Sequence, residues 1–267
     1  MTFSNCEDYE ALLGRYGYAQ DEEWIKYLRV HFNRFVTTRK FIYERSQPHR
    51  GQRLLDVGAH ALLQTLMYAL DGFEAVAADV PLPFTAPHAR RLEEAFNIEL
   101  LTYEDLSHPV ELGSLPDCHF DIVLFSEILE HITLNPVEMW QHLYRLLKPG
   151  RTIILITPNF YSLDGRWFWE IRRILRGRGA GLSVDYILQT NTMGPHWKEY
   201  CTKEIYEYFA LLSPDFTIRR AVRCNCYPPR SRLRGLIQEW LKPMGQYLYV
   251  EIDLKEKKHG IVVEPHW

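Results

Sequence analysis

A run of five residues, Glu127-Ile-Leu-Glu130-His131, carries the side chains of this sequence that are best suited to chemistry. On a helix, residues at positions i, i+3 and i+4 share one face, so we expect Glu127, Glu130 and His131 to point the same way. Two carboxylates and an imidazole make a mixed oxygen and nitrogen site that suits a divalent ion such as Mg²⁺ or Mn²⁺. In the alternative without a metal, His131 is a general base and Glu130 packs locally.

The elements that must position these residues alternate along the chain. Short apolar runs predict strands, and helical patterns lie between them; the predicted strands cover 53–57, 74–79, 98–102, 120–125 and 152–157, and the helices cover 62–70, 86–96 and the segment after residue 135. In that last helix Asn135 is the expected N-cap, Pro136 the first helical residue and 148–150 the stop. This alternation indicates a parallel sheet with helices on both faces. A final strand pair is expected at 216–223 and 246–254, with a helix at 231–241 between them.

Several polar residues and turns follow the predicted strands directly. Ligands of such sheets bind outside the carboxyl ends of the strands, so these positions are candidates for a binding site: Gly58, Asp79, Asp105, Glu127 and Pro158. Gly58 allows a tight turn in which backbone amides can approach a ligand. Asp79 follows it by 21 residues, close to the spacing at which an acidic side chain reaches ribose hydroxyls in dinucleotide folds.

The order of these motifs resembles the class I S-adenosylmethionine-dependent methyltransferases over roughly residues 50 to 260. The resembling segments are LLDVGAH (54–60), VAADV (76–80), YEDL (103–106), FDIVLFSEILEHI (120–132), LLKPGRTIILITPN (146–159) and HWKEYCTKEIYEYFALL (196–212). The resemblance implies a Rossmann-like fold with a mostly parallel seven-stranded sheet, an antiparallel last strand and an N-terminal helical extension. It also implies a set of residues that bind S-adenosylmethionine, namely Asp56, Gly58, His60, Asp79, Asp105, Leu106 and Ser126.

The E-x-x-E-H pattern is similar to two metal-using branches of this superfamily, the ubiquinone-pathway O-methyltransferases and the small-RNA 2′-O-methyltransferases. In both branches a later histidine joins the metal cluster, and His196 stands at the matching place here. The resemblance therefore implies that Glu127, Glu130, His131 and His196 hold a divalent metal, with His131 and Glu130 as the catalytic pair.

The glycine loop departs from the family pattern D-x-G-x-G-x-G. The sequence from Asp56 reads D-V-G-A-H-A-L, so that His60 and Leu62 replace two glycines. A side chain at His60 would crowd the cofactor unless the loop follows a wider path. A non-catalytic scaffold that kept the fold but lost the cofactor is the corresponding alternative.

Two regions lie outside the common core. Residues 1–50 are expected to form an N-terminal helical cap on a methyltransferase domain at 51–267, and a substrate or lid insertion is expected at about 160–195. Within that insertion, residues 165–178 carry five arginines and one glutamate among aromatic residues. Such a helix could receive an anionic or lipid-linked acceptor or touch a membrane surface; the alternative is a solvated helix with its apolar face in the core.

Composition narrows the class of protein. Of 267 residues, 46% are hydrophobic and 24% charged, and the net charge is −3, which is typical of a globular protein and argues against a dedicated nucleic-acid binder. Five scattered cysteines include no C-x-x-C pair. The N-terminal segment does not read as a secretory signal, and no apolar run is long enough to span a membrane, so a cytoplasmic protein is expected.

Three functions follow. The first is O-methylation of a small molecule or glycan, because a hydroxyl acceptor must lose a proton and the E-x-x-E-H cluster can take it. The insertion at 160–195 favours a sugar or lipid-linked saccharide as the acceptor. The second is a small-RNA-type 2′-O-methyltransferase, and the third is a non-catalytic scaffold.

Overall fold

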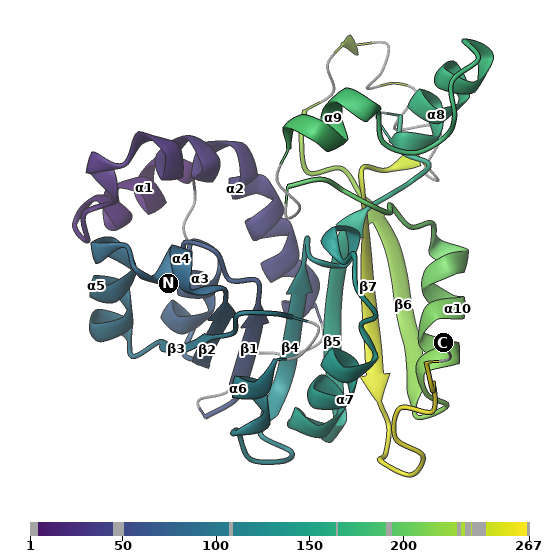
Figure 1. The fold of residues 1–267 in the computed structure, drawn as a ribbon. Coiled ribbons are helices and arrows are strands. Elements are labelled where there is room, and N and C mark those ends of the chain that lie inside the picture. Colours follow the sequence, from purple (N-terminus) through teal and green to yellow (C-terminus); the bar gives the residue numbers. More distant parts are fainter. Residues whose placement is uncertain are drawn as a thin grey trace.

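A seven-stranded sheet forms the centre of the molecule (Figure 1). The computed structural model describes residues 5–44, 51–106, 109–163, 165–190, 194–228, 231–232, 236 and 244–265. The strand order is β3-β2-β1-β4-β5-β7-β6, and the strands are β1 (Arg53–Val57), β2 (Glu74–Asp79), β3 (Glu99–Thr102), β4 (Phe120–Ser126), β5 (Leu147–Pro158), β6 (Phe216–Cys224) and β7 (Tyr247–Leu254). All neighbours from β3 to β5 pair in parallel, whereas β7 is antiparallel to both β5 and β6. The predicted Rossmann-like methyltransferase fold is confirmed.

Helices bury both faces of this sheet, as the near-continuous apolar strands require. Successive residues of a strand point to opposite faces, and in β4 Val123 and Phe125 join one hydrophobic cluster while Ile122 and Leu124 join another. The first face is covered by α6 (Val110–Gly113), α7 (Val137–Leu146) and α10 (Thr202–Leu212). The second is covered by α1 (Cys6–Gly14), η1 (Tyr18–Gln20), α2 (Glu22–Tyr43), α3 (Thr65–Leu70), α4 (Pro81–Phe84) and α5 (Pro87–Phe96).

The predicted N-terminal helices pack directly on the loop that follows β1. Tyr9 donates a hydrogen bond to the carbonyl of Leu63 (2.7 Å), and Tyr18 donates one to the carbonyl of Ala61 (2.5 Å). Both tyrosines are fully buried in a cluster that they share with α3 and β2. The extension therefore shapes the carboxyl edge of the sheet, while the division at residue 50 into cap and domain stays a prediction.

Three predicted boundaries are wrong. The helix expected at 62–70 begins at Thr65, because His60 and Leu62 have left-handed φ angles of +53° and +60° that a right-handed helix excludes. The helix expected after residue 135 starts at Val137, so that Pro136 and not Asn135 is at its N-cap position. Asn135 still accepts a hydrogen bond from Val137 N (3.0 Å). Strand β5 begins at Leu147 and includes 148–150. The helix expected at 231–241 lies almost entirely outside the described residues.

Two further helices, α8 (Arg166–Leu175) and α9 (Val184–Gln189), stand apart from the layers (Figure 1, top). Neither helix contains a buried residue. The alternative in which the apolar face of this insertion lies in the core is therefore wrong. Among the described residues, no helix combines the length and apolar character needed to cross a membrane.

Candidate functional site

A cavity of about 680 Å³ opens at the carboxyl ends of β1, β2 and β4. Every residue predicted to bind the cofactor lines it: Asp56, Gly58, His60, Asp79, Asp105, Leu106 and Ser126. Glu127, His131 and His196 line the same cavity. Such a position, just past the strand ends of a parallel sheet, is the usual place for a ligand in this architecture.

Gly58 occupies a position that accepts no other residue without rearrangement. Its φ of +75° is left-handed, and a Cβ placed on it would lie 2.0 Å from Cδ1 of Ile128. Its amide donates to the carbonyl of Ala78 (2.8 Å), which ties the turn to the neighbouring strand. Gly58 therefore lets Ile128 pack closely on the turn that borders the cavity.

His60 and Leu62 adopt the left-handed backbone conformation that favours glycine. Both have left-handed φ angles, as Gly58 does, at an expected cost of about 1–2 kcal/mol for each non-glycine residue. The His60 ring packs edge-on against Trp24 (centroids 4.6 Å apart) and in a tilted arrangement against Tyr27 (5.1 Å), both on α2. Leu62 is fully buried in the core. The N-terminal helices thus enclose the side chains that distinguish this loop from a glycine loop.

The two aspartates of the loop region have different partners. Asp79 accepts hydrogen bonds from the amides of His60 (2.6 Å) and Val80 (2.7 Å), and burial raises its pKa while those amides lower it. Asp56 accepts a hydrogen bond from Thr65 Oγ1 (2.6 Å) at the start of α3, and burial raises its pKa to about 7. Asp56 therefore fixes the loop to the helix, whereas Asp79 lies beside the amides that border the cavity.

The E-x-x-E-H segment is not an α-helix, so the expectation that its three polar side chains share one helical face is wrong. Glu127 has a φ of +60°, its amide extends the pairing of β4 through Ile156 O (2.9 Å), and a 3₁₀ turn, η2 (Leu129–His131), follows. The left-handed residue sends Glu127 toward Arg34 of α2, with Arg34 Nη1 3.4 Å from its carboxylate. Burial raises the pKa of Glu127, and Arg34 opposes that effect.

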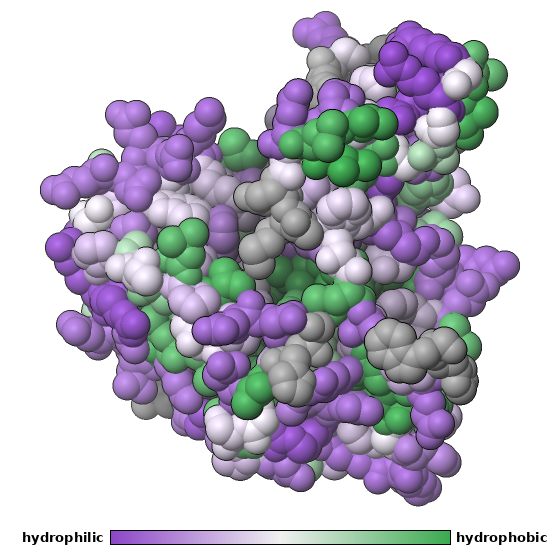
Figure 2. Space-filling model, in the orientation of Figure 1, coloured by the Kyte–Doolittle hydropathy of each residue, from purple (hydrophilic) through white to green (hydrophobic). Residues whose placement is uncertain are grey.

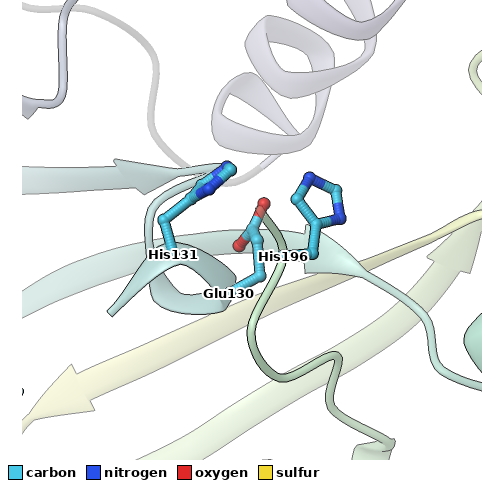
Figure 3. A group of neighbouring side chains, drawn as sticks. All are labelled: Glu130, His131 and His196. Carbon is cyan, nitrogen blue, oxygen red and sulfur yellow. The ribbon is translucent and has the colours of Figure 1, made fainter. Parts of the chain in front are cut away.

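Glu130, His131 and His196 nevertheless come together (Figure 3). One ligand atom from each lies within 4.8 Å of the other two, and the carboxylate sits between the imidazoles. Glu130 is fully buried; its Oε2 accepts from Thr157 (3.0 Å), and Oε1 has no hydrogen-bond partner among the described residues. Burial, and next the nearby Glu127, raise the pKa of Glu130 well above its usual range.

His131 is oriented by a backbone carbonyl. Its Nδ1 lies 3.1 Å from Pro195 O, and because a carbonyl can only accept, Nδ1 carries the proton in this contact. In the neutral ring Nε2 then holds the lone pair. Such an arrangement suits a general base or a metal ligand, since either role needs one fixed nitrogen with an available lone pair.

Backbone contacts hold His196 beside His131 although 64 positions separate Pro195 from His131 in the sequence. Trp197 N donates to the Glu130 carbonyl (2.7 Å), and Arg166 Nη1 donates to the carbonyls of His196 (2.9 Å) and Trp197 (2.6 Å). The second imidazole is oriented by Glu199, 3.4 Å from its Nδ1. Arg166 is the first residue of α8, so the insertion helps to position the site histidine.

Sequence reasoning missed Arg34. The guanidinium is 2% exposed, lies at the cavity, and has two nitrogens, Nε and Nη1, without a hydrogen-bond partner among the described residues. Its Nη2 reaches Tyr27 Oη (3.3 Å). The signal that could have found it is the spacing of Tyr27, His31, Arg34 and Phe35, which places polar and aromatic residues on one helical face. Buried polar atoms in this state point to a polar ligand.

Comparisons with known proteins agree with the fold. Residues 55–155 match the family model described as a methyltransferase domain. No curated protein matches the chain. Similar solved structures include the 1,6-didemethyltoxoflavin-N1-methyltransferase of Burkholderia thailandensis (14% identity, 96% of this chain and 93% of that chain, TM-score 0.56). Another is the PH0226 protein of Pyrococcus horikoshii OT3 (16% identity, 83% of this chain and 89% of that chain, TM-score 0.54). A third is an S-adenosylmethionine-dependent methyltransferase of Aquifex aeolicus (16% identity, 81% of this chain and 89% of that chain, TM-score 0.52). At these identities the structures share the fold.

Proposed function

We propose that the chain transfers a methyl group from S-adenosylmethionine to a hydroxyl oxygen, since residues 55–155 match the family model of a methyltransferase domain. The observation that carries this proposal is a single cavity that joins the loop at Gly58 and Asp79 to His131 and His196. A cofactor bound at the loop and an acceptor beside the histidines would then meet in one enclosed space. Holding both reactants in line is the main requirement for methyl transfer.

Gly58 and Arg34 provide the fit for S-adenosylmethionine. The absence of a Cβ at Gly58 lets the Ile128 side chain pack directly on the turn, whose backbone borders the cavity. Arg34 is a buried cation whose Nη1 lies 3.4 Å from the Glu127 carboxylate and whose Nε has no hydrogen-bond partner among the described residues. A carboxylate such as the one on the methionine part of the cofactor would be a suitable partner for Nε. Asp79 would accept hydrogen bonds from the ribose, and Asp105 and Leu106 would face the adenine. The bound cofactor supplies a methyl group on a positively charged sulfur.

His131 carries the proton chemistry in this proposal. The acceptor hydroxyl must lose its proton as the new carbon–oxygen bond forms, and Nε2 of His131 takes that proton while Pro195 holds Nδ1. Glu130 lies beside the imidazole and would stabilise the imidazolium that results. A nitrogen or carbon acceptor would not require this pair in the same way, which favours O-methylation.

A divalent metal is the alternative use of the same group. Glu130, His131 and His196 fit one, because they offer a carboxylate oxygen without a partner and two imidazoles within reach of a single ion. Two imidazoles and one carboxylate suit Mn²⁺ or Zn²⁺ better than Mg²⁺, which prefers oxygen. Since Arg34 engages Glu127, the fourth predicted ligand is left out of this set. A bound ion would lower the pKa of the acceptor hydroxyl.

The acceptor that we propose is a small molecule or a glycan, with a sugar or lipid-linked saccharide favoured. The insertion at 160–195 contacts the backbone of His196 and Trp197 through Arg166, and we propose that its aromatic and basic residues help to receive the acceptor. The net charge of −3 supports a small acceptor over RNA, because phosphate backbones call for a basic surface.

Cofactor binding tests the first half of the proposal. Replacing Asp79 with alanine removes an acceptor for the ribose hydroxyls, and we expect S-adenosylmethionine affinity to fall by about 1.5–3 kcal/mol, or roughly ten- to a hundredfold. Isothermal titration calorimetry measures it, with Asp185→Ala, an exposed carboxylate on α9, as the matched control. If the unaltered protein bound neither S-adenosylmethionine nor S-adenosylhomocysteine, the methyltransferase proposal would be abandoned.

Chelation separates the two uses of the histidine group. If a metal is required, excess EDTA is expected to abolish methyl transfer while leaving cofactor affinity nearly unchanged, and Mn²⁺ should restore the rate. The measurement is transfer of a labelled methyl group to a panel of sugars with isolated or adjacent hydroxyls. Full activity in EDTA would refute the metal site and leave His131 as the general base.

A further inference from the structure

Helices α8 and α9 form an apolar and basic surface that the catalytic site does not use. Their large apolar side chains are exposed: Phe168, Trp169, Ile171, Ile174, Leu175, Val184, Tyr186, Ile187 and Leu188. Leu175 and Leu188 are 80% and 79% exposed. In Figure 2 apolar residues gather over this projection at the top of the molecule, next to strongly hydrophilic ones. Exposed apolar patches of this kind mark interaction sites.

The sequence of α8 divides its surface into two faces. At 100° per residue, Phe168, Ile171, Ile174 and Leu175 fall within one stripe, and the arginines fall on the opposite side and along its edges. Arg172 lies over the rings of Phe168 (5.5 Å) and Trp169 (5.4 Å). Aromatic and aliphatic residues bordered by arginine are typical of a helix that lies in a membrane interface.

The charge of α8, α9 and the segment between them indicates what kind of surface they bind. Between residues 166 and 189 the chain has five arginines and two acidic residues, whereas the whole protein is acidic. Glu170 is already paired with Arg166 (2.8 Å), so the remaining arginines are not neutralised by it. A basic rim around an apolar stripe complements a surface that is apolar within and negatively charged at its boundary. We propose that α8 and α9 bind an anionic lipid bilayer as a peripheral membrane surface.

This surface is connected to the active-site region. Arg166 begins α8, donates to the carbonyls of His196 and Trp197, and its amide donates to Glu199 (3.0 Å), the carboxylate that contacts His196. A bilayer bound to α8 would therefore lie close to the entrance of the cavity. An amphiphilic acceptor could then reach the site without leaving the lipid surface.

Flotation of the full-length protein with lipid vesicles tests the proposal. Vesicles of phosphatidylcholine and phosphatidylglycerol in equal parts should bind the protein, and vesicles of phosphatidylcholine alone should bind it much less. Arg176→Gln with Arg178→Gln should weaken partitioning about 25-fold, because each arginine near an anionic surface contributes about fivefold. Leu175→Glu with Leu188→Glu should abolish it. The matched controls are Lys203→Gln and Leu211→Glu, exposed residues of α10, which should bind like the unaltered protein.

Three results would overturn the proposal. The first is failure of the unaltered protein to float with the mixed vesicles, and the second is equal loss of binding in the α8–α9 and α10 variants. The third is a dimer in light scattering that Leu175→Glu and Leu188→Glu convert to a monomer, without vesicle binding, since a second copy of the chain would then be the occupant. All four positions replaced on α8, α9 and the following turn are exposed, so these variants are expected to fold normally.

Discussion

Replacing His131 with alanine is expected to lower the rate of methyl transfer about 10²- to 10⁴-fold. The variant loses the nitrogen that would take the acceptor proton, and it also loses one of the two imidazoles of the candidate metal group. Cofactor affinity should change little, because the loop at Gly58 and Asp79 does not depend on this ring. Steady-state rates with labelled S-adenosylmethionine, together with calorimetry of cofactor binding, measure both quantities.

The control for this prediction is His142→Ala, a histidine on α7 that contacts Glu138 away from the cavity. It should retain the full rate. A His131→Ala variant within tenfold of the unaltered kcat would contradict the assignment of His131 as base or ligand. A parallel loss of cofactor affinity would instead show that the ring supports the pocket as a structural residue.

Replacing Gly58 with alanine is expected to have the second large effect. The new Cβ would lie 2.0 Å from Ile128 Cδ1, and the left-handed backbone costs a further 1–2 kcal/mol, about tenfold in any equilibrium that requires this shape. We expect cofactor affinity to fall more than tenfold and the free energy of unfolding to drop by at least about 1–2 kcal/mol. Calorimetry and urea denaturation give the two values.

Two variants separate the steric part of this effect from the backbone part. Gly58→Ala with Ile128→Ala removes the atoms that clash and should recover part of the affinity. Gly150→Ala has the same left-handed backbone, with φ of +74°, but no atom within 4 Å of the new Cβ, so it should cost stability without affecting the cofactor. An unchanged affinity in Gly58→Ala alone would refute the close approach of a ligand to this turn.

The sequence predicted the sheet well because its strands carry strong local signals. Runs such as Glu74–Asp79 and Phe120–Ser126 are apolar on both faces, and both appear as strands with nearly the predicted bounds. The residues predicted to bind the cofactor also converge on one cavity, since they lie at or near strand ends and parallel strands end at one edge. That convergence can be predicted from the order of strands and helices along the chain alone.

The orientation of Glu127 could not be read in the same way. The spacing of Glu127, Glu130 and His131 predicts one helical face, but the backbone at Glu127 is left-handed. That turn aims the carboxylate at Arg34, a residue 93 positions earlier on another helix. Contacts between distant segments depend on packing, and although the spacing of Tyr27, His31 and Arg34 marks one polar and aromatic face of α2, it does not tell that this face meets Glu127.

The insertion shows a third kind of difference. Its amphipathic pattern predicted a helix, and α8 is one, but periodicity does not tell whether an apolar face meets the core or the outside. The answer depends on whether a complementary apolar surface is available nearby, and the sheet below already has both faces covered.

The contacts of Tyr9 and Tyr18 with the carbonyls of Leu63 and Ala61 also bear on dynamics. Proteins open locally in cooperative units, and a helical segment at one end of the chain can detach while a central sheet stays folded. Detachment here would free the loop at 58–63, withdraw Arg34 from the cavity and release His60 from Trp24. Hydrogen exchange at these loop amides would then report the docking of the N-terminal helices, and a bound cofactor would slow it. The fraction of molecules able to bind the cofactor then depends on the equilibrium between docked and undocked helices. A higher ligand concentration shifts this equilibrium toward the docked state.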